Sequence, residues 1–230
     1  MDEQQVKETL REIRAKLRLG MNGVTSTSMR EKGMTYKLNF GVPFPEIRRL
    51  AASYQPDAAL AEAMWKEDVR ELKILATMLY PADQFTHEQA EAWIAEIPYL
   101  EIAESAGCHL YAQMPHAAGA AEHLLYDRRH AYARTVAFLT FMHLFASAAE
   151  IEPSHVNAFW CESIRTLTSE RFGAGWQEQQ SALKALKQYG RQSAEQARKV
   201  LLELDYLKDS DRPELQEIYN DLKFEFEYYF

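Results

Sequence analysis

The 230-residue sequence has only two cysteines, Cys108 and Cys161, and no long hydrophobic run. The two cysteines could pair, but in a reducing cytosol we expect two buried thiols. A membrane span needs roughly 18 uninterrupted apolar residues, and no window of the sequence approaches that length. The N-terminal residues are charged throughout, unlike those of a secretory signal peptide. These absences predict a cytoplasmic protein that makes no contact with a membrane.

The motifs that hold metals, phosphates or catalytic nucleophiles are also missing. Cys108, His109 and His116 have neither paired-cysteine nor His-Glu-x-x-His spacing, so no metal is predicted. The glycine-containing stretch 173–175 lacks both the lysine and the preceding strand of a phosphate-binding loop. No Ser-His-Asp or Cys-His arrangement can be assembled from the sequence alone. We therefore predict no cofactor.

Alternating runs of β-branched residues bounded by turns are absent, and helical periodicity dominates the chain. The fold class is therefore predicted to be all-α. Several helices begin with proline, serine or threonine close to an acidic residue, as helix N-termini often do. The segment 20–40, rich in Gly, Ser and Thr, is predicted to be irregular. We expect helices over 2–19, 44–54, 57–66, 68–80, 86–97, 99–113, 117–126, 129–146, 153–168, 176–190, 193–207 and 213–228.

Short helices joined by short turns, in successive antiparallel pairs, indicate stacked helical hairpins rather than a four-helix bundle. The second helices of three pairs, at 69–80, 133–145 and 179–190, share an early polar residue, a small and apolar middle and an aromatic end. The segment 129–146 is apolar almost all round, which predicts the most buried helix. We expect one domain over 1–230, made of an N-terminal helix and loop (1–40), a repeat core (41–207) and a C-terminal capping helix (208–230).

The net charge of −8 argues against a nucleic-acid partner, because Lys and Arg supply most of the non-specific affinity for phosphates. The charge is unevenly distributed, however. Residues 1–50 hold ten bases and six acids, a net of +4, whereas residues 203–230 hold three bases and nine acids, a net of −6. This asymmetry permits one basic face on an acidic protein.

Two helix starts between residues 31 and 80 carry a recognisable pattern. EKGMTYKLNFGVPFPEIRRLAASY is followed by LAEAMWKEDVRELKILATMLY, and the matching positions are Gly41, Val42, Pro45, Arg48, Leu50, Met64, Trp65 and Glu71. In these positions the sequence resembles the alkylpurine DNA glycosylase family of HEAT-like repeat proteins, the DNA alkylation repair proteins, over about residues 35–205. The resemblance implies an α-solenoid of stacked HEAT-like antiparallel helix pairs.

The resemblance also implies a site made of an acid, an arginine and two tryptophans. The acid position falls on Glu104, at the border of the apolar arc of its helix, and the arginine position falls on Arg134. One tryptophan position falls on Leu100, with Tyr99 beside it as a base-stacking candidate. The last tryptophan position falls near 184–185, where no aromatic residue stands.

Glu104 is the predicted catalytic residue, and the other reading of it is a helix-surface glutamate. Arg134, on an apolar helix, is predicted to extend its guanidinium to an edge, to pair internally with an Asp or Glu, or to point into a groove and meet an anion. The crowding of cations at 128–130, at the expected start of that helix, conflicts with the helix dipole and hints at anion binding. The DNA-binding candidates are Arg134, Arg128, Arg129, Lys184, Lys187 and Arg191.

The resemblance implies recognition of cationic N3- or N7-alkylated purines in double-stranded DNA, with excision as the activity of the family. We expect a monomer. A carboxylate would stabilise the developing oxocarbenium sugar, and aromatic faces would attract the cation. Two other functions stay open. One is a non-catalytic HEAT-like scaffold that binds DNA or protein on its concave face. The other is an enzyme that acts on a small molecule near Cys108, His109 and Tyr111.

Overall fold

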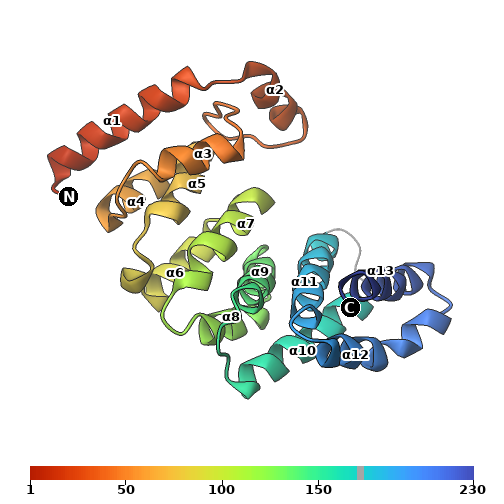
Figure 1. The fold of residues 1–230 in the computed structure, drawn as a ribbon. Helices are drawn as coiled ribbons and strands as arrows, with labels where there is room; N and C mark the ends of the chain where they lie inside the picture. Colours follow the sequence, from red (N-terminus) through yellow and green to blue (C-terminus); the bar gives the residue numbers. More distant parts are fainter. Residues whose placement is uncertain (170–173) are drawn as a thin grey trace. The chain divides into compact units, whose positions relative to one another are not determined.

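In the computed structural model, the described residues 1–169 and 174–230 form α-helices and short 3₁₀ helices, with no strand among them (Figure 1). The all-α prediction is confirmed. An isolated parallel bridge joins Leu38 to Val69. The chain divides into two compact units, 1–115 and 116–230, and each is described by itself. The division of one domain into segments 1–40, 41–207 and 208–230 stays a prediction.

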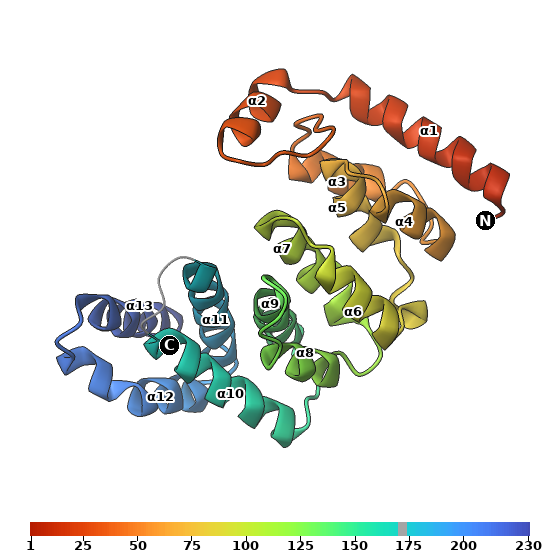
Figure 2. The same cartoon turned by 180° about the vertical axis from the view of Figure 1, so that it is seen from behind.

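The first unit is built around α5, in which nine of ten residues are buried. The helix α4 packs against one side of α5, and α3 and α7 also contact it. The N-terminal helix α1 lies alongside α4 (Figures 1 and 2). The helices of this unit are α1 (Glu3–Leu19), α2 (Gly23–Glu31), α3 (Phe44–Ala51), α4 (Ala58–Trp65), α5 (Arg70–Leu79), α6 (His87–Ala95) and α7 (Leu100–His109), with 3₁₀ turns at Ala82–Gln84 and Tyr111–Gln113.

The second unit is built around α9, which has eleven of its fourteen residues buried and packs between α8 and α11 (Figures 1 and 2). This burial agrees with the all-round apolar pattern of the segment, but the prediction that it forms the most buried helix was wrong, because a larger fraction of α5 is buried. The helices of this unit are α8 (Ala117–Leu125), α9 (Ala133–Ala146), α10 (Pro153–Thr168), α11 (Ala174–Gly190), α12 (Ala194–Glu203) and α13 (Pro213–Tyr229), with a 3₁₀ turn at Asp205–Asp209.

Helix pairing follows the pattern predicted from the sequence. The helices α5, α9 and α11 correspond to the three segments predicted as second helices, and they pack against α4, α8 and α10 respectively. Helix starts also follow local chemistry. The Thr86 hydroxyl accepts the N–H of Gln89, and the Ser193 hydroxyl accepts the N–H of Gln196.

The prediction that 20–40 is irregular was wrong, because α2 occupies Gly23–Glu31. Asn22 caps this helix by accepting the N–H of Thr25 at 3.1 Å. The buried Ser26 hydroxyl donates to the carbonyl of Asn39 at 2.8 Å. A helix with one buried residue has too weak an apolar stripe for sequence reasoning to detect, and tertiary contacts stabilise it instead.

Three other helix boundaries differ from the prediction by four residues. The helix expected from 129 begins at Ala133, because residues 127–130 form a turn around the Asp127 carboxylate. The helices expected over 99–113 and 193–207 end early and continue as 3₁₀ turns.

Neither cysteine pairs with another cysteine. Cys108 is half-buried and Cys161 is exposed, so the expectation of two buried thiols was wrong in burial, although neither cysteine forms a disulfide. None of the described helices combines the length and the apolar character that crossing a bilayer requires.

Candidate nucleic-acid interface

Helix α7 presents Glu104 from a rigidly held position in the first unit. On one side of Glu104, the Glu101 carboxylate accepts from the Arg70 guanidinium of α5 at 2.9 Å. On the other side, the Ser105 and Thr77 hydroxyls share a buried hydrogen bond of 2.6 Å. Glu104 itself is half-buried, as expected at the border of an apolar arc. The helix therefore fixes the Glu104 backbone, and the residue as a whole is partly exposed to solvent.

Tyr99 precedes α7 and is bound into the first unit. Its hydroxyl accepts the Thr35 N–H at 2.8 Å, and its ring packs edge to face against Tyr36 at 4.7 Å. Burial, together with the charge of Glu101, raises the pKa of Tyr36, so its hydroxyl stays protonated and donates to Glu101 at 3.0 Å. Tyr99 thus ties the segment before α3 to the start of α7. Its role as a base-stacking residue stays a prediction.

Glu71, part of the pattern that carries the family resemblance, organises the loop before α3. Its fully buried carboxylate accepts the N–H groups of Phe40 at 3.1 Å and Val42 at 3.2 Å, and it pairs with Arg70 at 3.0 Å. A carboxylate that receives backbone N–H groups replaces the hydrogen bonds that this loop would otherwise make with water. This motif residue therefore serves the fold of the first unit.

Trp65, in the same motif, also belongs to the core of the first unit. Its indole stacks on that of Trp93, with ring centroids 4.0 Å apart and planes 3° from parallel, and its N–H donates to Glu96 at 2.7 Å. The Lys73 ammonium lies 4.5 Å from the Trp65 ring centre. The indole of Trp65 is consequently enclosed rather than available to a ligand.

Arg134 lies near the start of α9 in the second unit and is 4% exposed. Its guanidinium pairs with Glu162 at 2.9 Å and with Glu178 at 3.0 Å. It also donates to the Leu125 carbonyl and the Thr166 hydroxyl. Of the three alternatives that the sequence leaves open, the structure shows internal pairing. Its role as a DNA contact remains a prediction that would require exchange of a carboxylate partner.

Glu162 on α10 is the centre of this ion-pair cluster. Its side chain is 1% exposed and pairs with Arg128 at 3.0 Å, Arg134 at 2.9 Å and Arg165 at 2.6 Å. Burial alone would raise the pKa of Glu162, but hydrogen bonds from Arg134 and Arg128 outweigh it and lower the pKa. Arg128 and Arg165 keep 44% and 67% of their side chains exposed. Arg128 and Arg165 are therefore held in position by Glu162 while much of each side chain stays exposed to solvent.

Sequence reasoning missed Glu162, although a signal was present. Glu162 lies three residues after the buried Phe159 and four before the buried Thr166, on the buried stripe of α10. An acid on such a stripe requires a cationic partner. Arg134 was predicted to lie on a buried helix and had no carboxylate assigned to it, so the two residues could have been matched.

The turn that contains Arg128 and Arg129 is organised by Asp127. The Asp127 carboxylate accepts the N–H of Arg129 at 2.7 Å, the N–H of His130 at 3.2 Å and the His130 ring nitrogen at 2.8 Å. Burial would raise the pKa of Asp127, but these hydrogen bonds lower it to about 2. Arg129 leaves this turn with 74% of its side chain exposed. The predicted conflict with the helix dipole does not arise, because these cations precede α9.

Lowering the pH should weaken the second unit through Asp127. Because the folded pKa of about 2 lies below the unfolded value of about 3.9, this stabilisation is present above about pH 5 and is lost as the pH falls toward 2. Asp127→Asn should therefore cost about 1–2 kcal/mol in urea unfolding at pH 7 and little at pH 2.5. Asp211→Asn, at an exposed position, is the control. An equal cost of Asp127→Asn at both pH values would contradict the assignment.

The remaining candidates lie on α11 and the turn after it. Lys187 pairs with Asp221 at 2.7 Å, and Arg191 pairs with Glu225 and lies 4.5 Å from the Tyr229 ring centre. These contacts tie α11 to α13. Lys184 is exposed on α11. Ala185 is fully buried. Neither Lys184 nor Ala185, the two positions near the family's last tryptophan, carries an aromatic ring.

The structure groups the candidates by unit. Arg128 and Arg134 share Glu162, and Lys187 and Arg191 share Glu225. Glu104 and Tyr99 both belong to the α7 region of the first unit. The fold and these clusters define an all-α, helical-repeat protein in which arginines are held by buried carboxylates.

Comparison with known proteins gives the family. The model of the family described as "DNA alkylation repair enzyme" matches residues 13–204, so the chain belongs to this family. One solved structure matches over 93% of both chains with a TM-score of 0.73 and 11% sequence identity. It is described as "a new family of proteins related to the HEAT-like repeat DNA glycosylases with affinity for branched DNA structures". This likeness confirms the predicted HEAT-like repeat fold. No curated protein matches the sequence significantly.

Proposed function

We propose that this protein binds DNA and recognises cationic N3- or N7-alkylated purines, with the Glu104 carboxylate facing the positively charged base. The observation that carries the proposal is a half-buried glutamate residue at the family's acid position, on a helix whose neighbouring side chains are held by hydrogen bonds. A partly buried charge acts on a nearby cation more strongly than one in bulk water, because the effective dielectric constant is lower.

The chemistry that this carboxylate supplies is electrostatic. An alkylated purine already carries a positive charge and is therefore a good leaving group. As the bond from the base to the sugar breaks, positive charge develops on the sugar, and a preorganised carboxylate stabilises it. The family's two tryptophan positions hold no indole here, with Leu100 at the first and residues 184–185 at the second. Each missing cation–π contact removes about 0.5–2 kcal/mol, so slow excision is expected.

Phosphate contacts are assigned to cations with open guanidinium or ammonium surface. Arg128, Arg129 and Arg165 meet this condition in the second unit, and Lys184 is exposed on α11. Buried carboxylates position two of the three arginines, which lowers the entropy lost on binding a phosphate. Arg134 and Lys187 are paired with carboxylates inside the protein, so they would act by positioning their neighbours.

A second candidate function is DNA binding without excision. The loss of both tryptophans favours it, and the structurally similar protein is described as having affinity for branched DNA. The overall charge of −8 favours a third candidate, a scaffold that binds protein.

Release of 7-methylguanine and 3-methyladenine from methylated duplex DNA tests the proposal. Glu104→Gln should lower the rate of release at least about 100-fold, because it removes the charge and keeps the shape. Glu88→Gln, at an exposed position in the same unit, is the matched control and should leave the rate unchanged. Equal rates for wild type and Glu104→Gln would overturn the catalytic role.

Binding to a duplex and to a four-way junction, at two salt concentrations, separates the other candidates. No release together with salt-dependent binding, weakened by a combined Arg128→Gln and Arg129→Gln change, would favour DNA binding alone. Absence of both release and binding would favour the scaffold.

A further inference from the structure

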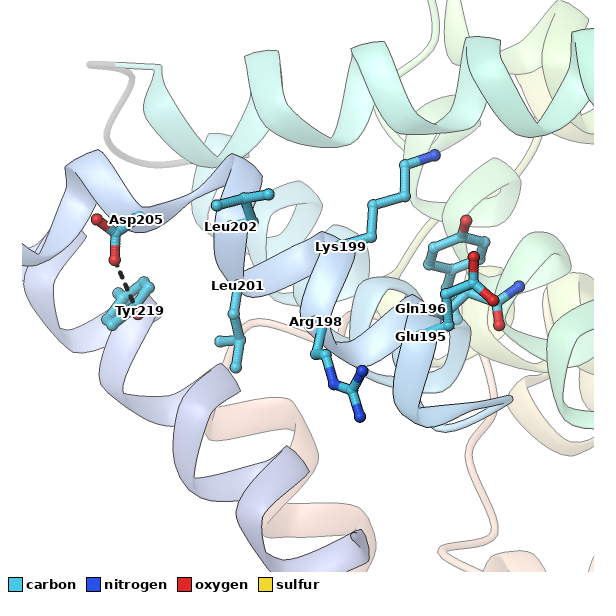
Figure 3. Close-up of a pocket in the computed structure, with 9 residues that line it drawn as sticks. Glu195, Gln196, Arg198, Lys199, Leu201, Leu202, Asp205 and Tyr219 are labelled. Atoms are coloured by element: carbon cyan, nitrogen blue, oxygen red, sulfur yellow. Dashed lines mark hydrogen bonds between the residues drawn. The ribbon is translucent and has the colours of Figure 1, made fainter.

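Two adjoining cavities in the second unit share three lining residues. One cavity of about 850 Å³ lies along α12 and reaches Tyr219 of α13 (Figure 3). The other, of about 500 Å³, lies against α10 and the end of α9. Tyr189, Gln196 and Lys199 line both. Each volume falls within the roughly 300–1,000 Å³ typical of small-molecule sites.

The cations of these cavities differ from nine other described lysines and arginines of the second unit. Nine described lysines and arginines of this unit have a carboxylate within salt-bridge distance: Arg128, Arg129, Arg134, Arg165, Lys187, Arg191, Lys208, Arg212 and Lys223. Arg198 and Lys199 have no such partner among the described residues. In a chain with an excess of acids, two adjacent cations without carboxylate partners indicate a site for an external anion.

One of the two acids that line the larger cavity is already paired with another cation. Asp205 is paired with Lys208 at 2.6 Å and accepts the Tyr219 hydroxyl at 3.2 Å. Glu195 lies in the first turn of α12, where the helix dipole stabilises its negative charge.

The smaller cavity supplies an aromatic surface next to Lys199. The Lys199 ammonium lies 5.3 Å from the centre of the Trp160 ring, and the Trp160 and Tyr189 rings are 5.9 Å apart. Figure 3 shows the Lys199 side chain pointing toward α10 and Arg198 leaving α12 in a different direction. The two cations can therefore contact successive phosphates, with only Lys199 beside the aromatic pair.

We propose that these cavities bind an unpaired nucleotide segment of single-stranded DNA. The base stacks in the smaller cavity against Trp160, which is half-exposed and is backed by the 6% exposed Tyr189 ring, its phosphate lies at Lys199, and the next phosphate lies toward Arg198. The side-chain amide of Gln196, at the junction, is placed to meet a base edge. An acidic peptide would satisfy the cations but would not use the aromatic pair, whereas a paired duplex keeps its bases stacked on one another. This site is distinct from Glu104 and does not depend on excision.

The probe is a fluorescein-labelled ten-residue oligothymidylate, measured by anisotropy with the full chain at several salt concentrations. Arg198→Gln/Lys199→Gln should lower the dependence of log affinity on log salt by about 1.4, from two lost contacts of about 0.7 each. The double variant Lys66→Gln/Lys223→Gln has the same net charge at exposed sites outside the cavities and should keep the wild-type slope.

The aromatic contribution is tested separately. Trp160→Ala should weaken binding about tenfold and Trp160→Phe less, with circular dichroism to show that both variants fold. Excision by Arg198→Gln/Lys199→Gln should match the wild type, and Glu104→Gln should bind the oligothymidylate normally, so the two proposals fail independently. Equal slopes for the two double variants, no effect of Trp160→Ala, or equal competition by a ten-residue polyglutamate would overturn the proposed site.

Discussion

Replacing Glu162 with glutamine is expected to lower the free energy of unfolding by about 3–5 kcal/mol. The change leaves the guanidinium of Arg134, 4% exposed, with Glu178 as its remaining carboxylate partner. It also releases Arg128 and Arg165, which pair with Glu162 at 3.0 and 2.6 Å. A buried charge that loses one of its two carboxylate partners keeps the desolvation penalty and loses much of the compensating attraction, which explains the size of the effect.

Urea unfolding of the variants at pH 7 measures this effect. Glu178→Gln is the matched control, because Glu178 is 25% exposed and pairs with the same arginine. It should cost about 1 kcal/mol, since water partly replaces the lost contact. Adding Arg134→Met to Glu162→Gln should recover part of the stability, because the uncompensated buried charge is removed. A smaller cost for Glu162→Gln than for Glu178→Gln would contradict the central role of Glu162.

Replacing Gly41 with alanine is expected to lower the free energy of unfolding by about 3 kcal/mol or more. Gly41 has a φ of +69°, a conformation that residues with a Cβ adopt at a cost. An added Cβ would also lie 2.3 Å from the Asn22 carbonyl oxygen and 2.8 Å from the Ser26 nitrogen. Both atoms belong to the backbone of the first turn of α2, which cannot move aside like a flexible side chain.

Gly33→Ala separates the two causes. Gly33 has a φ of +89° but nothing within 4 Å of an added Cβ, so this variant should show the conformational cost alone, about 1–2 kcal/mol. The excess cost of Gly41→Ala then measures the contact with α2. Thermal or urea unfolding of both variants makes the comparison, and equal costs would show that α2 does not pack on Gly41 as described.

The helices could be predicted because their signals are local. Apolar spacing and N-terminal residues such as Thr86 and Ser193 identify a helix from a few neighbouring positions. The exception, α2, shows the limit of that reasoning. It has one buried residue, and its stability depends on Asn39 and Gly41, which lie beyond its own C-terminus.

The functional residues were predictable to different degrees. The half-burial of Glu104 follows from its place on a helical arc, which periodicity gives directly. The partners of Arg134 do not follow, because Glu162 and Glu178 lie 28 and 44 residues away and meet it only when α9, α10 and α11 pack together. The sequence likewise could not show that the Arg128 side chain is partly exposed whereas Lys187 is paired with Asp221.

The sequence by itself determined the all-α class, most helix positions and the family, because these depend on periodicity and on motifs within short stretches. Only the tertiary structure decided which charges are compensated. Glu71 and Glu162 became buried centres for distant N–H groups and arginines, whereas Arg198 and Lys199 were left without carboxylate partners among the described residues. The physical reason is that the free energy of a charge depends on what surrounds it in space, which sequence neighbours do not specify.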